Sequence, residues 1–428
     1  MSYAEFLAAK ARRHQSAGVT VDPDHIHHSL HDWQRRIVMS ALQRGRSAVF
    51  ADTGLGKTRM QIEWSRLIAP SALIIAPLSV ARQTVREAIK IDADVRYVRR
   101  PEDVVPGSVS ITNYELAHHF NAYAFDAVAL DESSILKNFT GSTRNALIAQ
   151  WRDTPYKSSW SATPAPNDVT ELCNQAEFLG VMPRNEMLAA YFVHDDEGWR
   201  LKGHAIDPMF AWMATWAIAA RRPSDVGGDD SPYQLPPLNI EAVTVAVEVE
   251  QDGQLFATDL GGVGGRAAIR RSTLDARVGV AAQLLANRGQ WIAWCGLNDE
   301  AEAITRLVDG AVNVHGTLTP DEKADAFERF QDGQIRVLVT KPSIAGMGMN
   351  FQNCHQMVFV GLSDSWESYY QSVRRCWRFG QQNQVDAYVV VSELEQQIVQ
   401  NVRRKENEVA GWVDRLVCHT NNRVAVLA

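Results

Sequence analysis

The stretch Ala51-Asp52-Thr53-Gly54-Leu55-Gly56-Lys57-Thr58 follows a short apolar run, residues 47–50, and precedes a helical pattern that begins at Met60. A buried strand, a glycine-rich turn and a helix N-terminus in this order place backbone amides where they can bind a polyphosphate. The first position of the usual pattern is Ala51 rather than glycine. A plain glycine-rich turn is the structural alternative, but Gly-Lys-Thr at such a junction favours a phosphate-binding loop.

The last residues of this loop have separate chemical roles in that interpretation. The backbone amides of Gly54, Leu55 and Gly56 are expected to face the phosphates, because glycine allows their close approach. The ammonium group of Lys57 can reach the β- and γ-phosphates, and the Thr58 hydroxyl can ligate Mg²⁺. The loop therefore predicts a site for a nucleoside triphosphate and Mg²⁺.

The composition is that of a soluble globular protein of two or three domains. The chain has 428 residues, 46% of them hydrophobic, and no apolar run approaches the ~20 residues of a membrane span. The densest run, residues 209–220, ends at Arg221 and Arg222. Residues 1–15 lack the apolar core of a secretory signal, so we expect a cytoplasmic protein. With a net charge of −7, nucleic-acid binding would require a local basic surface.

The cysteines and histidines predict neither a disulfide framework nor a metal site. The five cysteines are odd in number and far apart in the chain. Four histidines crowd one short stretch without partner cysteines or a carboxylate pattern, which favours a solvated segment over a metal site. These histidines are His25, His27, His28 and His31.

Gln34 is a candidate base-reading residue. It lies near the start of an amphipathic helical pattern that ends near Gly45. Its amide can both donate to and accept from the edge of an adenine. Alone the residue would be unremarkable, but it precedes Ala51 by only seventeen residues.

An acidic pair follows a buried strand in the first half of the chain. Strands at 72–76, 109–112 and 126–130 alternate with helical patterns, which predicts a parallel sheet covered by helices. The third of these strands ends at Asp131 and Glu132, at the sheet edge where open α/β sheets bind ligands. We expect Asp131 to hold magnesium through water and Glu132 to orient and deprotonate the attacking water. An acidic turn that caps the next helix is the alternative.

The rest of the chain predicts an insertion and a second α/β sheet. Residues 169–237 read as aromatic-rich helices followed by a linker rich in Gly, Asp, Ser and Pro. A second alternation follows without a phosphate loop, and the glycine-rich residues 261–265 are expected to form a flexible loop. Its strands are predicted at 291–295, 312–315, 335–340, 357–360 and 387–391. The predicted domains are 1–167, 168–235 and 236–428.

Two arginines in the second half are candidate catalytic residues. Arg375 and Arg378 are three residues apart, so on a helix they would share one face. Guanidinium groups that reach a phosphoryl-transfer site can raise the rate by about 10³ to 10⁵. A basic amphipathic helix on the surface is the alternative.

With these motifs in order, the chain resembles the superfamily-two helicases, and among them the SWI/SNF-type translocases, particularly compact versions encoded by bacteriophages. The resemblance extends over more than four-fifths of the chain and depends on the joint order of the motifs. Ser133-Ser134 and Trp377 depart from the usual family pattern. The matching motifs are Leu30-x-x-Trp33-Gln34, Ala51 to Thr58, Ala76-Pro77-Leu78, Thr112 to Glu115, Asp131-Glu132 with Leu136-Lys137-Asn138, Ser161 to Asn167, Arg221-Arg222, Leu235-Pro236-Pro237, Gly346 to Asn350 and Gln371 to Gln381.

The resemblance implies two tandem RecA-like domains with a helical insertion, and it implies ATP and Mg²⁺ as ligands. Gly348 and Gln371 would add contacts to the nucleotide, which would lie between the two domains and be completed by the two arginines. Nucleic-acid contacts are implied for Pro77, Thr112, Asn113, Tyr114, Gly316 and Asn350.

The resemblance implies an ATP-dependent translocase on double-stranded or branched DNA, monomeric and active in the cytoplasm of a bacterial or phage-infected cell. A strand-separating DNA or RNA helicase shares every catalytic residue and is the first alternative. An ATP-switched DNA-binding adaptor without motor activity is the second. We find no bromodomain, chromodomain, zinc or nuclease motif that would add a further activity.

Overall fold

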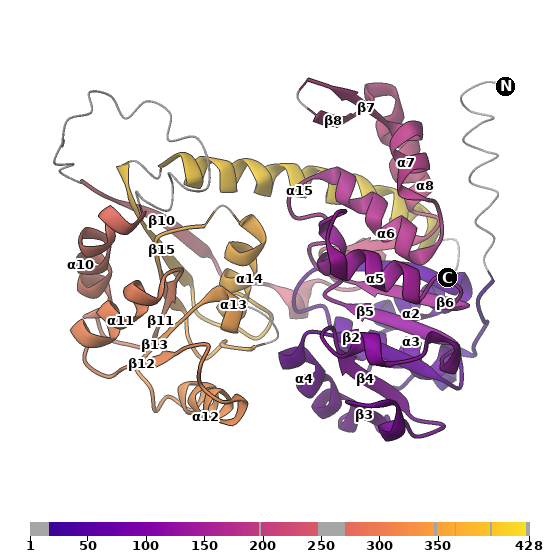
Figure 1. Cartoon of the computed structure of the whole chain (residues 1–428), viewed down its shortest axis with the longest axis horizontal. Helices are drawn as coiled ribbons and strands as arrows, with labels where there is room; N and C mark the ends of the chain where they lie inside the picture. Colours follow the sequence, from indigo (N-terminus) through magenta and orange to yellow (C-terminus); the bar gives the residue numbers. More distant parts are fainter. Residues whose placement is uncertain are drawn as a thin grey trace. The chain divides into compact units, whose positions relative to one another are not determined.

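The computed structural model describes residues 17–196, 198–246, 270–345, 349–363, 365–393 and 396–424. The chain divides into two compact units (Figure 1). Unit 1 extends to Tyr233 and also includes the segment from Asn407 onward, whereas unit 2 runs from Gln234 to Glu406. The glycine-rich residues 261–265 and residues 346–348 lie outside the described residues.

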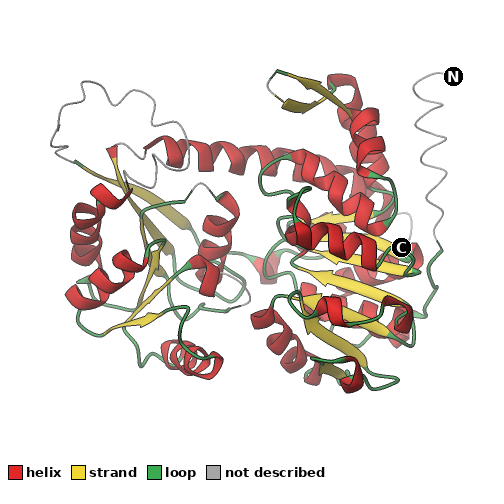
Figure 2. Ribbon diagram, viewed as in Figure 1, coloured by secondary structure: helices red, strands yellow, loops and turns green. Residues whose placement is uncertain are grey.

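Unit 1 is built on a parallel sheet of seven strands in the order β3-β4-β2-β5-β6-β1-β9. The predicted parallel sheet is thereby confirmed, and helices cover both of its faces (Figure 2). Its strands are β1 (Arg46–Ala51), β2 (Ala72–Ala76), β3 (Val95–Tyr97), β4 (Val109–Asn113), β5 (Ala127–Asp131), β6 (Tyr156–Trp160) and β9 (Ala217–Ala220). Helix α2 (Asp32–Arg44) precedes β1, and the helices between the strands include α3 (Lys57–Ile68), α4 (Leu78–Ile89) and α5 (Ser142–Gln150).

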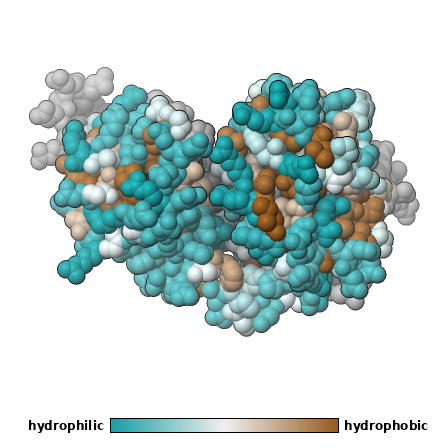
Figure 3. Space-filling model, turned by 90° about the horizontal axis from the view of Figure 1, so that it is seen from below, coloured by the Kyte–Doolittle hydropathy of each residue, from teal (hydrophilic) through white to brown (hydrophobic). Residues whose placement is uncertain are grey.

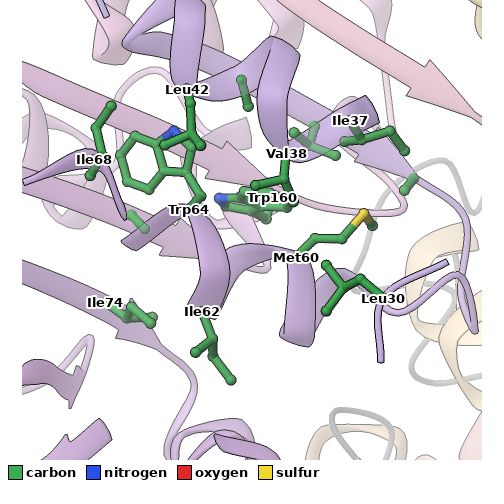
Figure 4. Packing of buried hydrophobic residues seen from close by; sticks show 14 of the residues in the cluster. Leu30, Ile37, Val38, Leu42, Met60, Ile62, Trp64, Ile68, Ile74 and Trp160 are labelled. Carbon is green, nitrogen blue, oxygen red and sulfur yellow. The ribbon is translucent and has the colours of Figure 1, made fainter. Parts of the chain in front are cut away.

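The core of unit 1 explains why the phosphate loop has a fixed frame. Apolar residues of α2 and α3 pack against one face of the sheet, and Trp64 and Trp160 lie among them with no exposed surface (Figure 4). Met60 of the first α3 turns is likewise fully buried. Both elements that flank the loop, β1 and α3, are therefore anchored by burial of apolar surface.

The segment predicted as a helical insertion also contains strands, and in this respect the prediction was wrong. After helices α6 (Leu172–Leu179) and α7 (Arg184–Tyr191), the chain forms an antiparallel hairpin of β7 (Phe192–Asp195) and β8 (Gly198–Leu201). After α8 (Ile206–Met213), β9 pairs in parallel with β1. The insertion is thus part of the sheet that carries the phosphate loop.

Hydrogen bonds connect the insertion and the C-terminal segment to the strands of unit 1. The ammonium group of Lys157 in β6 donates to the carbonyls of Arg152 (2.8 Å) and Phe178 (3.2 Å). Helix α15 (Gln396–Val424) returns to this unit, where the Thr420 hydroxyl accepts a hydrogen bond from the Ala219 amide at 3.3 Å. The end of β9 is thereby held from outside the sheet.

Unit 2 is built on a second parallel sheet, of six strands in the order β10-β15-β14-β11-β13-β12. The prediction of a second α/β sheet is confirmed. The strands are β10 (Leu238–Val245), β11 (Trp291–Cys295), β12 (Ala311–Val314), β13 (Val337–Thr340), β14 (Gln356–Val360) and β15 (Val385–Ser392). The helices are α10 (Leu274–Leu285), α11 (Asn298–Leu307), α12 (Pro320–Gln331), α13 (Pro342–Ala345) and α14 (Trp366–Cys376).

A carboxylate of the protein itself caps the helix that follows β11. One oxygen of Glu300 accepts hydrogen bonds from the amides of Gly296 (2.8 Å) and Leu297 (2.9 Å). The other oxygen accepts from Arg277 at 2.7 Å and Arg270 at 3.2 Å. The amides of Gly296 and Leu297 at this strand-to-helix junction are therefore already bound by an anion of the protein itself.

Removing Arg277 is expected to destabilise unit 2 strongly. Arg277 and Glu300 both have 0% exposure, so Arg277→Met leaves a buried carboxylate with less than its full counter-charge. We expect a loss of about 3–5 kcal/mol in the free energy of unfolding, measured by urea denaturation. Arg329→Met is the control, because Arg329 is 50% exposed in its pair with Asp325 and should cost at most about 1 kcal/mol. Equal losses in the two variants would contradict the internal cap.

Among the described residues on the face seen in Figure 3, hydrophilic residues predominate and apolar residues gather in several groups. The more exposed large apolar side chains include Ile89, Tyr123, Phe139 and Leu307. Among the helices of the described residues, none is both long and apolar enough to cross a membrane.

Candidate nucleotide-binding site

The phosphate loop has the backbone conformation that its glycines predict. Gly54 (φ +91°) and Gly56 (φ +78°) lie in the left-handed region, which L-residues with a Cβ rarely adopt. Gly56 caps α3 without a side chain that could accept hydrogen bonds from the first amides of the helix. Those amides are therefore oriented for an external anion, which is the fit expected of a polyphosphate site.

The side chain of Lys57 folds back onto the start of the same loop. Its ammonium group donates to the carbonyls of Ala51 (2.8 Å) and Asp52 (3.2 Å). Thr58 follows in the first turn of α3 and is partly exposed. A cation and a hydroxyl thus lie at the start of the helix, as a magnesium–nucleotide site requires.

Asp131 belongs to the same site although it comes from another strand. It ends β5 with 4% exposure, and burial together with the Glu132 charge raises the pKa of Asp131 to about 7, while the Lys57 charge acts in the opposite direction. A carboxylate in this position is stabilised as an anion by a divalent cation. Asp131 and Thr58 are thus the residues that would hold Mg²⁺.

Glu132 adopts a strained backbone conformation. Its φ of 49° and ψ of 53° place it in the left-handed region, where within the described part of the chain only one other non-glycine residue, Asp92, has a positive φ. Such a conformation costs about 1–3 kcal/mol and is retained chiefly where function needs it. The Glu132 amide donates to the Asp131 carboxylate at 2.9 Å, which fixes the orientation of the pair.

Tyr114 supports the acidic pair, a role that the sequence did not reveal. Its hydroxyl donates to the backbone carbonyl of Asp131 at 2.6 Å, and burial raises the pKa of Tyr114 well above its usual value. The sequence placed Tyr114 among the nucleic-acid contacts, and nothing in its spacing pointed to Asp131. Tyr114 therefore acts as a positioning residue at the end of β5.

Gln34 contacts the phosphate loop directly. Its Nε2 donates to the carbonyl of Leu55 at 3.0 Å, and its Oε1 accepts from the amide of His31 at 2.9 Å. The structure thus brings together the base-reading candidate and the loop. The base-reading role itself stays a prediction.

The two arginines of unit 2 meet on one backbone carbonyl. Arg375 donates to the carbonyl of Met349 at 3.0 Å, and Arg378 donates to the same oxygen at 3.3 Å. The expected shared helical face was wrong, because α14 ends at Cys376 and Arg378 lies beyond it. The two side chains therefore share the Met349 carbonyl as an acceptor and do not share a face of one helix.

Gln371 fixes the first of these arginines. Its Oε1 accepts from Arg375 at 2.6 Å, and both side chains are buried. Arg378 is only partly buried. Gly348, the other predicted nucleotide contact of unit 2, lies outside the described residues.

The predicted nucleic-acid contacts of unit 1 lie at the carboxyl ends of β2 and β4. Pro77 is the partly exposed N-cap of α4. Thr112 is fully buried. The side-chain amide of Asn113 accepts a hydrogen bond from the Tyr97 hydroxyl and donates one to the Glu115 carboxylate. A direct phosphate contact by Thr112 or Asn113 would require these groups to rearrange, so their role stays a prediction.

In unit 2, the two predicted nucleic-acid contacts lie on loops. Gly316 is exposed, and its carbonyl accepts from Lys323 at 2.8 Å. Asn350 is partly exposed, and its side-chain oxygen accepts from the Gln352 amide at 3.3 Å. Both remain accessible to a ligand.

No metal cluster accompanies the N-terminal histidines. Among the described residues, no group of three or more His, Cys, Asp and Glu side chains is placed to hold a metal ion. His27 instead bonds to Ser29 and lies 3.7 Å from Asp92.

Residues 277–380, inside unit 2, match the family model of the helicase conserved C-terminal domain. No curated protein is significantly similar to the chain. The chain is similar to the solved structure of S. cerevisiae Dbp5 bound to RNA and ADP BeF3, with a TM-score of 0.56, 14% identity, and coverage of 90% of this chain and 93% of that chain. It is also similar to the Sulfolobus solfataricus SWI2/SNF2 ATPase core in complex with double-stranded DNA, with a TM-score of 0.45, 16% identity, and coverage of 95% and 97%.

The similarity to the Dbp5 structure agrees with a fold of two parallel α/β sheets. At such low identity, the similarity to solved structures concerns the fold alone. The chain therefore consists of tandem RecA-like domains, the second of which carries a segment similar to the helicase conserved C-terminal domain.

Proposed function

We propose that the chain is a nucleic-acid-dependent ATPase of the superfamily-two helicase type and that it moves along double-stranded DNA. The observation that carries the proposal is the shared site of the phosphate loop and the acidic pair. The loop follows β1 and the acidic pair ends β5; β6 pairs with both strands, and its Trp160 is the register partner of both Val49 and Asp131. The strained Glu132 follows directly after Asp131. A loop that only bound phosphate would not need this second, costly feature.

The residues of unit 1 divide the chemistry of ATP hydrolysis between them. The amides of Gly54, Leu55 and Gly56 bind the phosphates, and Lys57 neutralises their charge. Thr58 and Asp131 are the residues that would hold Mg²⁺, which when bound offsets the charge that develops on the phosphate oxygens. Glu132 orients the attacking water and accepts its proton.

Unit 2 contributes the positive charge of Arg375 and Arg378 to the transition state. Gln371 keeps Arg375 oriented, which lowers the entropy lost when the guanidinium engages a phosphate. The carbonyl of Met349, which follows the predicted nucleotide contact Gly348 in the sequence, accepts hydrogen bonds from both arginines. Turnover in this proposal depends on both units.

Double-stranded DNA is supported as the track by the SWI/SNF-type order of the sequence motifs. Contacts mainly to phosphates give little sequence preference and a strong dependence on salt. An RNA or strand-separating helicase is the second candidate, because the fold is shared with Dbp5, whose structure contains RNA. An ATP-switched adaptor is disfavoured by the strained Glu132, which binding alone does not require.

The test compares ATP hydrolysis with double-stranded DNA, single-stranded DNA, branched DNA and RNA of equal length. The proposal predicts the largest stimulation by double-stranded or branched DNA and a loss of stimulation as salt rises. A second assay compares displacement of the third strand from a triplex with separation of a duplex, and the proposal predicts displacement only. Stronger stimulation by RNA, or duplex separation, would favour the helicase candidate instead.

A further inference from the structure

The segment before Tyr233, predicted as part of a linker, is folded onto helix α2. The guanidinium of Arg36 donates to the carbonyls of Val226 (3.3 Å) and Gly227 (3.2 Å). Gly228 packs so closely on Trp33 that a Cβ there would lie 2.7 Å from the indole ring. The segment therefore has a fixed place beside the first turn of α2.

Tyr233 completes an aromatic cluster at that helix end. Its ring meets Trp33 edge-on at 5.6 Å and His31 edge-on at 5.8 Å, while the His31 and Trp33 rings are stacked at 6.3 Å. Trp33 is buried, whereas His31 is exposed and Tyr233 partly exposed. The accessible aromatic surface of the cluster therefore belongs to Tyr233 and His31.

The cluster adjoins the phosphate loop through two neighbours in the chain. Gln34 follows Trp33 and bonds to Leu55 of the loop. Arg59 follows Thr58 in the chain, and its charge acts on Tyr233. Burial raises the pKa of Tyr233, while a hydrogen bond with Trp33 and the Arg59 charge oppose that shift. Arg59 is held by Glu87 at 3.2 Å. An aromatic face, an amide edge and a phosphate loop thus lie next to one another.

The amide of Gln34 retains hydrogen-bonding capacity toward a ligand. An amide nitrogen has two donors and an amide oxygen has two lone pairs, and Leu55 and His31 each use one. A planar base with donors and acceptors on its edge matches this remaining capacity. A phosphate would match the amide but not the aromatic rings.

We propose that Tyr233, with His31 beside it, stacks on the purine base of the bound nucleotide. The inference rests on the proposed ATPase function and adds to it a base-binding residue from a segment outside the sequence motifs. Tyr233 belongs to unit 1, so the base would be bound by the same unit that binds the phosphates. Stacking on an aromatic side chain, by its usual contribution per base, should change nucleotide affinity by about 5- to 150-fold.

The test measures the KM for ATP and the inhibition constant of tripolyphosphate in Tyr233→Ala. We expect the KM to rise by about 5- to 150-fold with little change in kcat, because stacking acts equally on ground and transition states. Tripolyphosphate has phosphates but no base, so its inhibition constant should not change. Tyr233→Phe keeps the ring and should keep the wild-type KM.

The control is Tyr123→Ala, which removes a tyrosine of unit 1 that is 84% exposed and should change neither constant. An unchanged KM in Tyr233→Ala would overturn the stacking. A parallel rise in the tripolyphosphate constant would also overturn it, because Tyr233 would then act through the shape of the loop. A wild-type chain that neither binds nor hydrolyses ATP would instead contradict the proposed function itself.

Discussion

Arg378→Ala is expected to lower the kcat of nucleic-acid-stimulated ATP hydrolysis by about 10³- to 10⁵-fold. A guanidinium that engages the transferring phosphoryl group stabilises charge that is absent from bound ATP, so the effect falls on kcat rather than on KM. Arg378 is the better probe of the two arginines. Both arginines donate to the Met349 carbonyl, but Arg378 lies beyond the end of α14 and is partly exposed, whereas Arg375 is buried and also bonded to Gln371.

Steady-state phosphate release in the presence of nucleic acid measures this loss. Arg306→Ala is the matched control, because Arg306 is an exposed arginine of the same unit. Its kcat should equal that of the wild type. A wild-type kcat in Arg378→Ala would remove Arg378 from the hydrolysis mechanism and leave Arg375 as the only candidate of the pair.

Glu132→Gln is expected to lower kcat by about 10²- to 10⁴-fold while ATP binding is retained. Glutamine preserves the size and the hydrogen-bonding oxygen of the side chain but cannot accept the proton of the attacking water. The Lys57 and Thr58 contacts of the loop are unaffected by this change. Binding should therefore be close to wild type, measured by the fluorescence of a labelled ATP analogue, while phosphate release is lost.

Glu102→Gln serves as the control, because Glu102 is an exposed carboxylate of the same unit. If Glu132→Gln weakened binding as much as turnover, Glu132 would act by holding the nucleotide rather than by activating water. If it changed neither, the strained backbone at Glu132 would need another explanation.

The sequence predicts those parts of the structure that local patterns determine. Residues 48–51 of β1 and residues 127–130 of β5 are continuous apolar runs, which are typical of buried parallel strands. Strand β9 was missed because its sequence, Ala217 to Ala220, has small residues without alternation. Its pairing with β1 is a long-range contact that no local pattern encodes.

Charged residues were harder to place than apolar ones. Arg277 and Glu300 form a fully buried pair, although charged side chains are rarely buried completely, and neither residue was singled out from the sequence. The end of α14 before Arg378 also carries no clear stop signal, since glycine first appears at Gly380. In both cases, the burial of the charged pair and the end of the helix depend on contacts with residues that are far away in the sequence.

The segment around Tyr233 shows how composition can mislead. Glycine, aspartate, serine and proline predict a linker, but these side chains bond to one another and to neighbouring backbone. Asp230 accepts from both the amide and the hydroxyl of Ser224, and Asp225 accepts from the Arg221 amide. Arg36 of α2 then fastens the segment to unit 1.

The most direct test of the account is the rate of phosphate release from ATP by the full chain with and without saturating double-stranded DNA. The account predicts a low basal rate, a large stimulation by DNA, and the loss of that stimulation in Glu132→Gln. A rate that is the same with and without any nucleic acid, or one that Glu132→Gln leaves unchanged, would contradict it.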